Sequence, residues 1–420
     1  TVAQTLANIT PLAITLDLTA QNKVYNGNNA ATTTLGSTGI LGTDVVVFSG
    51  DPATFSDKNV ANGKTVTENN IVATGADAGN YSFLNTASTT ADITPLTITV
   101  GATADNKVYD ATTTAHAHVG SGGVLLGDTV DFTAGSADFI DKNVANGKQV
   151  DVNGITASGA DAGNYLFNTS TQTAANITPL NIVVAASASD KVYDGNNAAV
   201  ALLGSTGILG TDTVNFTGNA ATFSDKNVAN GKTVTVSGIV GGGADAGNYT
   251  FNHVAQTTAN ITPLAIVGSI IAGSKTYDGS TTAQTSGTLA GVIGSDQLGV
   301  SSSGSFADKN AGSGKTVNVA GVLTGADAGN YTLTTNATTT ADVYKVVLNL
   351  DGTRVYDGGT VASAGMFGSA GVIAGVAGES LILSGQGVLG SKNVATDRPL
   401  AGLGSLTLND DGAGLASNYT

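Results

Sequence analysis

Apolar and polar residues alternate along many short segments of this chain. In the segment "PLTITV" at 95–100, Leu96, Ile98 and Val100 share one face, and threonines stand between them. The same period of two recurs in "DTVDF" at 128–132, "KTVTV" at 232–236 and "NYTFN" at 248–252. This period is typical of strands with one buried face, and no segment keeps a helical period. The pattern therefore predicts an all-β protein whose short strands are joined by turns.

These segments belong to a unit that repeats along the chain. A tyrosine in a motif of the type "KVYDG" recurs every 84 residues and, in the last copy, after 79 residues, at Tyr25, Tyr109, Tyr193, Tyr277 and Tyr356. The octet "DKNVANGK" occurs three times, and a fourth copy reads "DKNAGSGK". A fixed period of this length indicates a tandem array. The predicted modules are 9–92, 93–176, 177–260, 261–342 and 343–420.

The two ends of the chain match parts of further copies. Residues 1–8 match the last strand of a preceding repeat, and 343–420 is a degenerate repeat that stops where its final strands are expected. We therefore expect the sequence to be a fragment of a longer array.

Each module has room for about six or seven short strands, which predicts a small β-sandwich. The strand order is left open between an immunoglobulin-like and a β-grasp-like arrangement. The junctions contain a proline and no Gly–Ser stretch, which favours a rod-shaped array. At ~3.3 Å per residue in a strand, five modules in line would span roughly 150–200 Å.

Composition narrows the classes of function. The net charge is −15, which makes nucleic acid and anionic membranes poor partners. No apolar run approaches the ~20 residues of a membrane helix, so we expect no membrane insertion. There is no cysteine, which excludes disulfides and thiol chemistry.

The heptapeptide "GADAGNY" occurs four times, at 75–81, 159–165, 243–249 and 325–331. Gly and Asn suit a tight turn, and the tyrosine begins the next strand. The order is similar to the tyrosine corner of immunoglobulin-type sandwiches, in which the tyrosine bonds to upstream backbone. We predict this structural role for Tyr81, Tyr165, Tyr249 and Tyr331.

A calcium loop is the alternative interpretation of the same heptapeptide. Its candidate ligands are Asp77, Asp161, Asp245 and Asp327. Calcium takes six to eight oxygens, and each loop offers one carboxylate. A site would therefore need Asp57 or Asp110 from another loop to converge on it.

Lysines occupy three fixed slots of the module, which predicts structural pairing with Asp or carbonyl oxygens. A Lys–Asn isopeptide crosslink is the sharper alternative. The slots are Lys23, Lys107, Lys191 and Lys275; Lys58, Lys142, Lys226 and Lys309; and Lys64, Lys148, Lys232 and Lys315.

Other chemistry is sparse. His116 and His118 form an H-x-H pair in one module, so they are either solvent-facing residues or a weak metal pair. No Ser–His–Asp set recurs, so we expect no enzymatic activity and no cofactor. A second hypothesis is that each module binds a polysaccharide weakly and repetition supplies avidity. Its candidate contacts are Tyr109, Asp110, Tyr193, Asp194, Tyr277 and Asp278.

The motifs "KVYDG", "TDTV", "DKNVANGK" and "GADAGNY", at fixed spacing, resemble the YDG repeat domain of filamentous-haemagglutinin-like bacterial adhesins. Departures from the motif are Asn26, Ala111, Arg354 and Ser391. The resemblance implies a secreted or cell-surface protein of a Gram-negative bacterium, exported by two-partner secretion through an outer-membrane partner. It also implies a stalk that supports attachment or biofilm cohesion, with extracellular polysaccharide or host glycans as partners.

Overall fold

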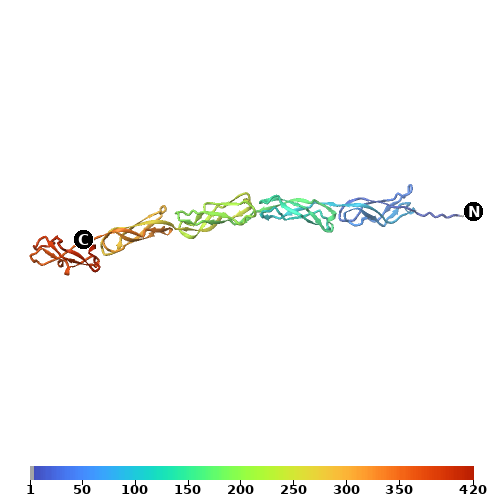
Figure 1. Cartoon of the computed structure of the whole chain (residues 1–420). Coiled ribbons are helices and arrows are strands. Elements are labelled where there is room, and N and C mark those ends of the chain that lie inside the picture. The colour runs from blue at the N-terminus through green and yellow to red at the C-terminus, as the bar shows by residue number, and fades with distance from the viewer. Residues whose placement is uncertain (1–3) are drawn as a thin grey trace. The chain divides into compact units, whose positions relative to one another are not determined.

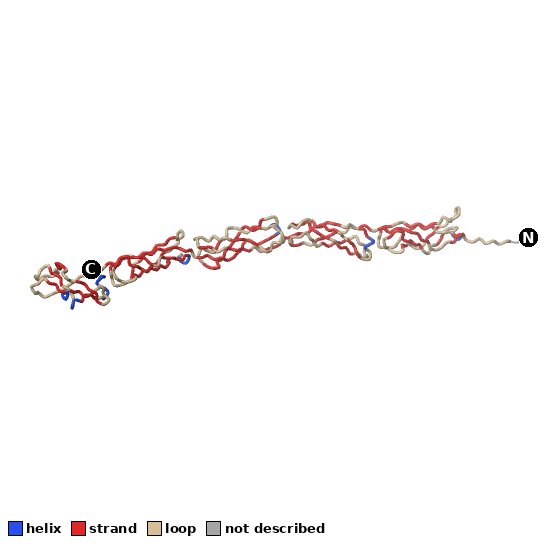
Figure 2. The backbone as a smooth tube through the Cα atoms, in the orientation of Figure 1, coloured by secondary structure: helices blue, strands red, loops and turns tan. Residues whose placement is uncertain are grey.

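The computed structural model describes residues 4–420 (Figure 1). The chain divides into two compact units. The first comprises residues up to 184 together with 205–217 and 241–252, and the second comprises 185–204, 218–240 and 253–420. The described residues form strands and short 3-10 turns, and strands make up the body of every module (Figure 2). The protein is thus an all-β tandem array of five small β-sandwich modules.

The first two modules have the same succession of elements. Module 1 contains β1 (Leu12–Ala13), β2 (Asp17–Ala20), β3 (Lys23–Val24), β4 (Thr33–Gly36), β5 (Val47–Ser49), β6 (Thr54–Phe55), β7 (Ala61–Glu68), β8 (Val72–Thr74), η1 (Ala78–Asn80), β9 (Tyr81–Ser82) and β10 (Ala87–Thr94). Module 2 contains β11 (Leu96–Thr97), β12 (Gly101–Ala104), β13 (Lys107–Val108), β14 (Ala117–Gly120), β15 (Asp131–Thr133), β16 (Ser136–Phe139), β17 (Ala145–Asn153), β18 (Thr156–Ser158), η2 (Ala162–Asn164), β19 (Tyr165–Leu166) and β20 (Ser170–Thr178).

The third and fourth modules repeat this order with longer strands in the fourth. Module 3 contains β21 (Leu180–Ile182), β22 (Ala185–Ala188), β23 (Lys191–Val192), β24 (Ala201–Gly204), β25 (Asn215–Thr217), β26 (Thr222–Phe223), β27 (Ala229–Ser237), β28 (Val240–Gly242), η3 (Ala246–Asn248), β29 (Tyr249–Phe251) and β30 (Val254–Thr262). Module 4 contains β31 (Leu264–Ala272), β32 (Lys275–Thr276), β33 (Thr282–Ala283), β34 (Thr285–Ala290), β35 (Gly299–Phe306), β36 (Gly312–Thr324), η4 (Ala328–Asn330), β37 (Tyr331–Thr335) and β38 (Thr338–Tyr344).

Module 5 is the divergent one. It contains β39 (Val361–Ser363), η5 (Ala364–Met366), η6 (Ser369–Gly371), β40 (Val372–Ala374), η7 (Val376–Gly378), β41 (Ser380–Ser384), β42 (Gln386–Leu389), β43 (Leu400–Gly402), β44 (Thr407–Asp411) and η8 (Ala416–Asn418). Its strands form two three-stranded sheets, in the orders β39-β42-β43 and β40-β41-β44. Its motif tyrosine, Tyr356, lies outside the strands and is exposed.

Module 2 shows how the alternation builds a sandwich. One layer is a four-stranded sheet in the order β13-β20-β17-β16, in which β13 and β20 run parallel and the other neighbours antiparallel. In β17, Val150 and Val152 are fully buried, whereas the side chain of Gln149, the residue before Val150, is exposed to solvent. The second layer consists of short pairs, β12-β14 and β15-β18. Each apolar side chain buried between the layers stabilises the module by about 1.5–3 kcal/mol.

The strand expected over residues 1–8 is not formed in the described part of that segment. Residues 4–11 carry no strand, and residues 1–3 lie outside the described residues. The matching strand of module 1, β10, pairs with β7 and β3 of its own module. A strand needs such neighbours for its backbone hydrogen bonds.

Among residues 4–420, no helix is long and apolar enough to cross a membrane.

Candidate functional site: a repeated junction between modules

A buried carboxylate lies where module 1 meets module 2. Asp128 precedes β15, and its side chain is only 3% exposed. Its Oδ2 accepts hydrogen bonds from the hydroxyls of Tyr25 (2.7 Å) and Tyr165 (2.6 Å). Its Oδ1 pairs with the Lys58 ammonium at 2.6 Å. Tyr25 and Lys58 belong to module 1, so the acid of module 2 is held largely by its neighbour.

Lys58 connects this acid to the "GADAGNY" turn of module 2. Its Nζ lies 2.8 Å from Oδ1 of Asp161, which precedes η2. The same ammonium lies 5.9 Å from the centre of the Tyr25 ring, within the range of a cation–π contact. Hydrogen bonds to Asp128, Asp161 and Tyr25 raise the pKa of Lys58. The lysine therefore remains charged and bridges two carboxylates of the next module.

An asparagine completes the polar part of the junction. Asn164 is 3% exposed, and its Oδ1 accepts the backbone N–H of Val60 at 2.9 Å. Its Nδ2 donates to Oδ1 of Asn59 at 3.2 Å. These two contacts fix the backbone of the "DKNV" turn of module 1 against η2 of module 2. The side-chain amide is thus satisfied at both ends, as a buried amide requires.

Apolar contacts surround these polar groups. The rings of Tyr25 and Tyr165 meet edge to face, with centroids 5.6 Å apart. Ile98 and Leu125 of module 2 pack into the same cluster as Phe55 of module 1. The cores of the two modules are therefore continuous across the junction, and the Asp128 carboxylate is shielded from water.

The same junction recurs three more times, twice within the second unit. The acid, its two tyrosines and its lysine are Asp212 with Tyr109, Tyr249 and Lys142; Asp296 with Tyr193, Tyr331 and Lys226; and Glu379 with Tyr277, Tyr419 and Lys309. The asparagines are Asn248, Asn330 and Asn418, which accept the N–H groups of Val144, Val228 and Ala311. The last junction has Glu379 as its acid and Leu415 where the second aspartate stands elsewhere.

At each junction, the surroundings lower the pKa of the acid and raise the pKa values of the tyrosines. Hydrogen bonds from Lys226, Tyr193 and Tyr331 lower the pKa of Asp296 to about 2. Burial, and then the hydrogen bond to the acid, raises the pKa of Tyr165 to about 12, and the same causes act on Tyr249. The acid is therefore ionised and the tyrosines are protonated over the whole range of ordinary pH.

The family follows from these repeated elements. The sequence model of the YDG domain matches five segments, 10–91, 94–174, 176–259, 261–341 and 343–420. This chain belongs to the YDG domain family. Its modules are called YDG modules below. In each of the first four modules, the tyrosine of the motif "KVYDG" or its variant bonds to the acid of the next module.

Solved structures of tandem immunoglobulin domains are among those similar to the chain. The I9-I11 tandem of titin is 10% identical, covers 59% of this chain and 98% of its own, and has a TM-score of 0.17. Sidekick-1 immunoglobulin domains 1–5 are 6% identical over 80% of each chain, with a TM-score of 0.18. The four N-terminal Ig domains of Dscam1 isoform 6.9 are 6% identical, cover 80% of this chain and 97% of their own, and have a TM-score of 0.16. No curated protein matches the chain significantly.

The tyrosine of each "GADAGNY" motif bonds to upstream backbone and to the junction acid. Its hydroxyl accepts a hydrogen bond from a backbone N–H about 40 residues earlier. The pairs are Tyr81 with Leu41, Tyr165 with Leu125, Tyr249 with Leu209 and Tyr331 with Ile293. The same hydroxyl donates to the acid, which in module 1 is Asp44. The tyrosine thus anchors the loop that carries the acid.

The contacts of the candidate calcium aspartates favour a structural role for them. The Oδ2 atoms of Asp77, Asp161, Asp245 and Asp327 accept the N–H groups of Val45, Thr129, Thr213 and Gln297. The Oδ1 atoms of Asp161, Asp245 and Asp327 face Lys58, Lys142 and Lys226. Asp57 and Asp110 pair instead with Lys64 and Lys107. An ammonium therefore faces three of the four candidate aspartates, Asp161, Asp245 and Asp327.

The predicted glycan-contact tyrosines are wrong because all three are buried. Tyr109, Tyr193 and Tyr277 are at most 2% exposed, and their hydroxyls bond to the next module's acid. Asp110, Asp194 and Asp278 are about half exposed, and each pairs with a lysine three residues earlier at 2.7 Å. These aspartates organise their own loop.

The predicted structural pairing of the lysines is confirmed in all three slots. The first slot binds the loop, as Lys107 does through Asp110 and the carbonyls of Thr112 and Thr114. The second slot makes the junction, and the third pairs with the "DKN" aspartate, as Lys64 does with Asp57. In the second slot, hydrogen bonds to the junction acids raise the pKa of Lys58, Lys142 and Lys226, which keeps these lysines charged and disfavours a crosslink there.

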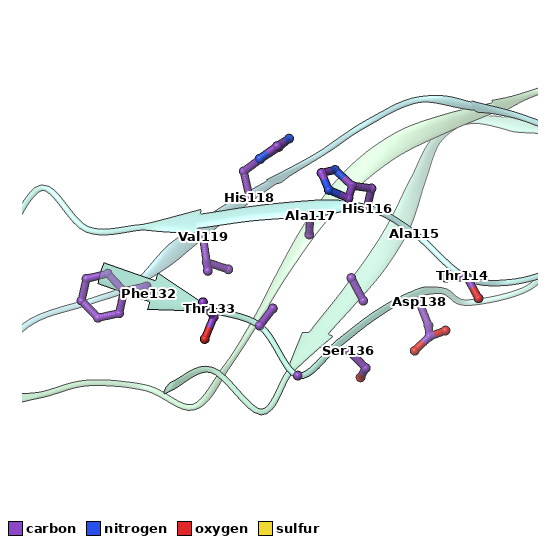
Figure 3. Close-up of a pocket in the computed structure, with 13 residues that line it drawn as sticks. Thr114, Ala115, His116, Ala117, His118, Val119, Phe132, Thr133, Ser136 and Asp138 are labelled. Carbon is purple, nitrogen blue, oxygen red and sulfur yellow. The ribbon is translucent and has the colours of Figure 1, made fainter. Parts of the chain in front are cut away.

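His116 directly precedes β14 and His118 lies within it, and the structure brings Asp105 to both rings. Both histidines are among the residues that line an open hollow of about 650 Å³, together with Val119, Phe132 and Thr133 (Figure 3). Sequence reasoning missed Asp105, and it also missed the junction acids Asp128, Asp212, Asp296 and Glu379. The available signal was a spacing of 103, 103, 103 and 102 residues from each motif tyrosine to its acid.

Proposed function

We propose that the YDG array is the spacer of a secreted bacterial surface adhesin, a non-enzymatic stalk that carries an adhesive part away from the cell. The observation that carries the proposal is the junction acid, which is bonded from both modules and recurs at all four junctions. A flexible string of domains needs no such contact, whereas a spacer that transmits force or sets a distance does. The proposed spacer function therefore depends on the contacts between modules more than on any single module.

The physical argument is the number of contacts that bending a joint would break. At the first junction, a bend must separate Tyr25 and Lys58 from Asp128, and Val60 from Asn164. Hydrogen bonds to a charged group contribute about 1.5–3 kcal/mol, so breaking the Tyr25–Asp128 bond has an appreciable cost. The edge-to-face tyrosines and the shared apolar cluster add to this cost. We infer that the joints are stiff and that the array is a rod.

The cellular setting forms part of the proposal. We place the protein outside a Gram-negative cell, exported by two-partner secretion through an outer-membrane partner, as in filamentous-haemagglutinin-like adhesins. The resemblance of the repeated motifs to those of such adhesins motivates this setting, and the absence of cysteine is compatible with it, since no disulfide can trap the chain before export. Extracellular polysaccharide or a host glycan is the proposed partner of the whole adhesin.

Small-angle X-ray scattering of the full chain tests the stiffness. We expect a maximum dimension on the order of 150–200 Å from ~3.3 Å per strand residue. The variant Asp128→Asn/Asp212→Asn/Asp296→Asn should remain folded and give a broader distance distribution. A compact particle, or identical curves for both proteins, would contradict the spacer.

A binding experiment separates the spacer from an adhesive array. The labelled chain is titrated onto bacterial exopolysaccharide and host cells, with and without calcium. We expect no saturable binding. Saturable binding by the five modules that a one-module chain lacks would favour a multivalent glycan-binding array instead.

A further inference from the structure

Three side chains of metal-ligand type meet on the exposed face of module 2. In the β12–β14 pair, Thr103 lies opposite His118 and Ala104 opposite Ala117, and the N–H of Asp105 donates to the carbonyl of His116. This register places Asp105 beside both histidines. Its Oδ2 lies 2.8 Å from Nδ1 of His116 and 3.4 Å from Nε2 of His118. The three ligand atoms all lie within 4.8 Å of one another.

This set suits a borderline transition ion. Zn²⁺ takes histidine nitrogens and carboxylate oxygens at ~2.0–2.1 Å, so the ligand atoms of a tetrahedral site lie about 3.3 Å apart. The observed separations are close to this value, and rings this exposed can adjust by small rotations. Two imidazoles also favour Cu²⁺ and Ni²⁺, whereas Ca²⁺ and Mg²⁺ prefer oxygen ligands alone.

We propose that Asp105, His116 and His118 form a binding site for one divalent transition ion, Zn²⁺, Cu²⁺ or Ni²⁺. The side chains are 58%, 73% and 61% exposed, so the remaining coordination positions face solvent. Such a site has room for water or for a ligand from another molecule. His116 and His118 also border the hollow near Val119, whereas Asp105 is not among the residues that line it (Figure 3).

The repeat itself supplies a second observation. The matching slots hold Gln21, Thr32 and Thr34 in module 1; Ser189, Val200 and Leu202 in module 3; and Gly273, Gln284 and Ser286 in module 4. The β2–β4 pair keeps the same register with threonines, as Thr19 opposite Thr34 shows. The fold therefore does not require these three residues. Two of the chain's three histidines have nevertheless gathered with an aspartate in one module.

Isothermal titration of Zn²⁺, Cu²⁺ and Ni²⁺ into the tag-free full chain tests the site. We expect one ion per chain for at least one of the three metals. His116→Ala, His118→Ala and Asp105→Asn should each weaken that affinity about tenfold or more. His253→Ala is the matched control, because it removes the remaining histidine and should leave the affinity unchanged. Thermal unfolding without metal verifies that the exposed substitutions leave the fold intact.

A second test introduces the same three ligands into another module, so that the expected result is a gain of metal binding. The variant Gln21→Asp/Thr32→His/Thr34→His places the three ligands at the same register in module 1. It should raise the stoichiometry from one ion per chain to two. Absence of binding by the unmodified chain, or binding that the His116 and His118 substitutions leave unchanged, would overturn the proposal.

Discussion

The junction acid is the residue on which the coupling of modules depends. Asp128 is removed from water, and an ionised carboxylate in that position is stable only while its donors stay in place. Two of the three donors come from the preceding module. The energetic consequence of losing the acid is therefore shared by both modules.

Asp128→Asn keeps the shape of the side chain and removes its charge. Because hydrogen bonds to charged groups contribute about 1.5–3 kcal/mol, we expect a loss of that size in the free energy of unfolding. Denaturation of the full chain measures it, and hydrogen exchange at 57–64 should show where protection is lost. The control Asp131→Asn makes the same charge change on an exposed face of β15 and should stay within about 0.5 kcal/mol. Equal effects of the two substitutions would contradict the role of Asp128.

Local sequence could not reveal this role. The alternation of Val234 and Val236 with threonines predicted their burial, because it depends on neighbours two positions away. Tyr109 was predicted as an exposed ligand contact, because the partner that buries it stands in the next module. Only the end-to-end docking of two modules brings such residues together, and periodicity within one module contains no information about it.

At the scale of elements, the "GADAGNY" turn positions the acid. Gly159 has a φ of +107°, and a Cβ there would lie 2.4 Å from the carbonyl oxygen of Thr129. This close approach lets Asp161 exchange two hydrogen bonds with the backbone of Thr129, next to Asp128. The sequence predicted the turn from its glycines and asparagine, but not that the turn holds another loop.

The two glycines of this turn should therefore respond differently to a methyl group. Gly159→Ala should destabilise module 2 by about 1–3 kcal/mol or more, since it combines backbone strain with a clash. Gly163→Ala is the matched control, because a Cβ there would meet nothing within 4 Å. It should be neutral or stabilising by up to about 1 kcal/mol. Thermal unfolding of the two variants compares them, and the reverse order would refute the close approach.

For the whole molecule, acid should weaken every junction. The pKa of Asp296 is about 2 in the folded chain against 3.8 for an ordinary aspartate, and the pKa values of Asp128, Asp212 and Glu379 are also lowered. A lowered pKa stabilises the folded state above the unfolded value, and this contribution is lost as the pH falls towards the folded value. We expect stability to drop between about pH 4 and pH 2. Thermal midpoints across that range measure it, and the Asp296→Asn variant should show a shallower drop.

Calcium should have no effect on the folded array. The ammonium groups of Lys58, Lys142 and Lys226 already face Asp161, Asp245 and Asp327, the carboxylates that a calcium ion would need. Thermal midpoints measured in EDTA and in excess Ca²⁺ should therefore agree. A saturable rise of the midpoint with Ca²⁺ would show that the loops at Asp161 and its counterparts bind the ion after all.

Each of the first four modules presents one half of the joint, a tyrosine, a lysine and a backbone amide, and the module that follows presents the complementary half. The two halves are nearly the same from copy to copy, so any module is compatible with any other as its neighbour. Genetic duplication or loss of a whole unit then creates a working joint at once, with no new interface to select. The number of modules, and with it the length of the array, can therefore change by one unit in a single genetic event, while the contacts at every junction stay the same.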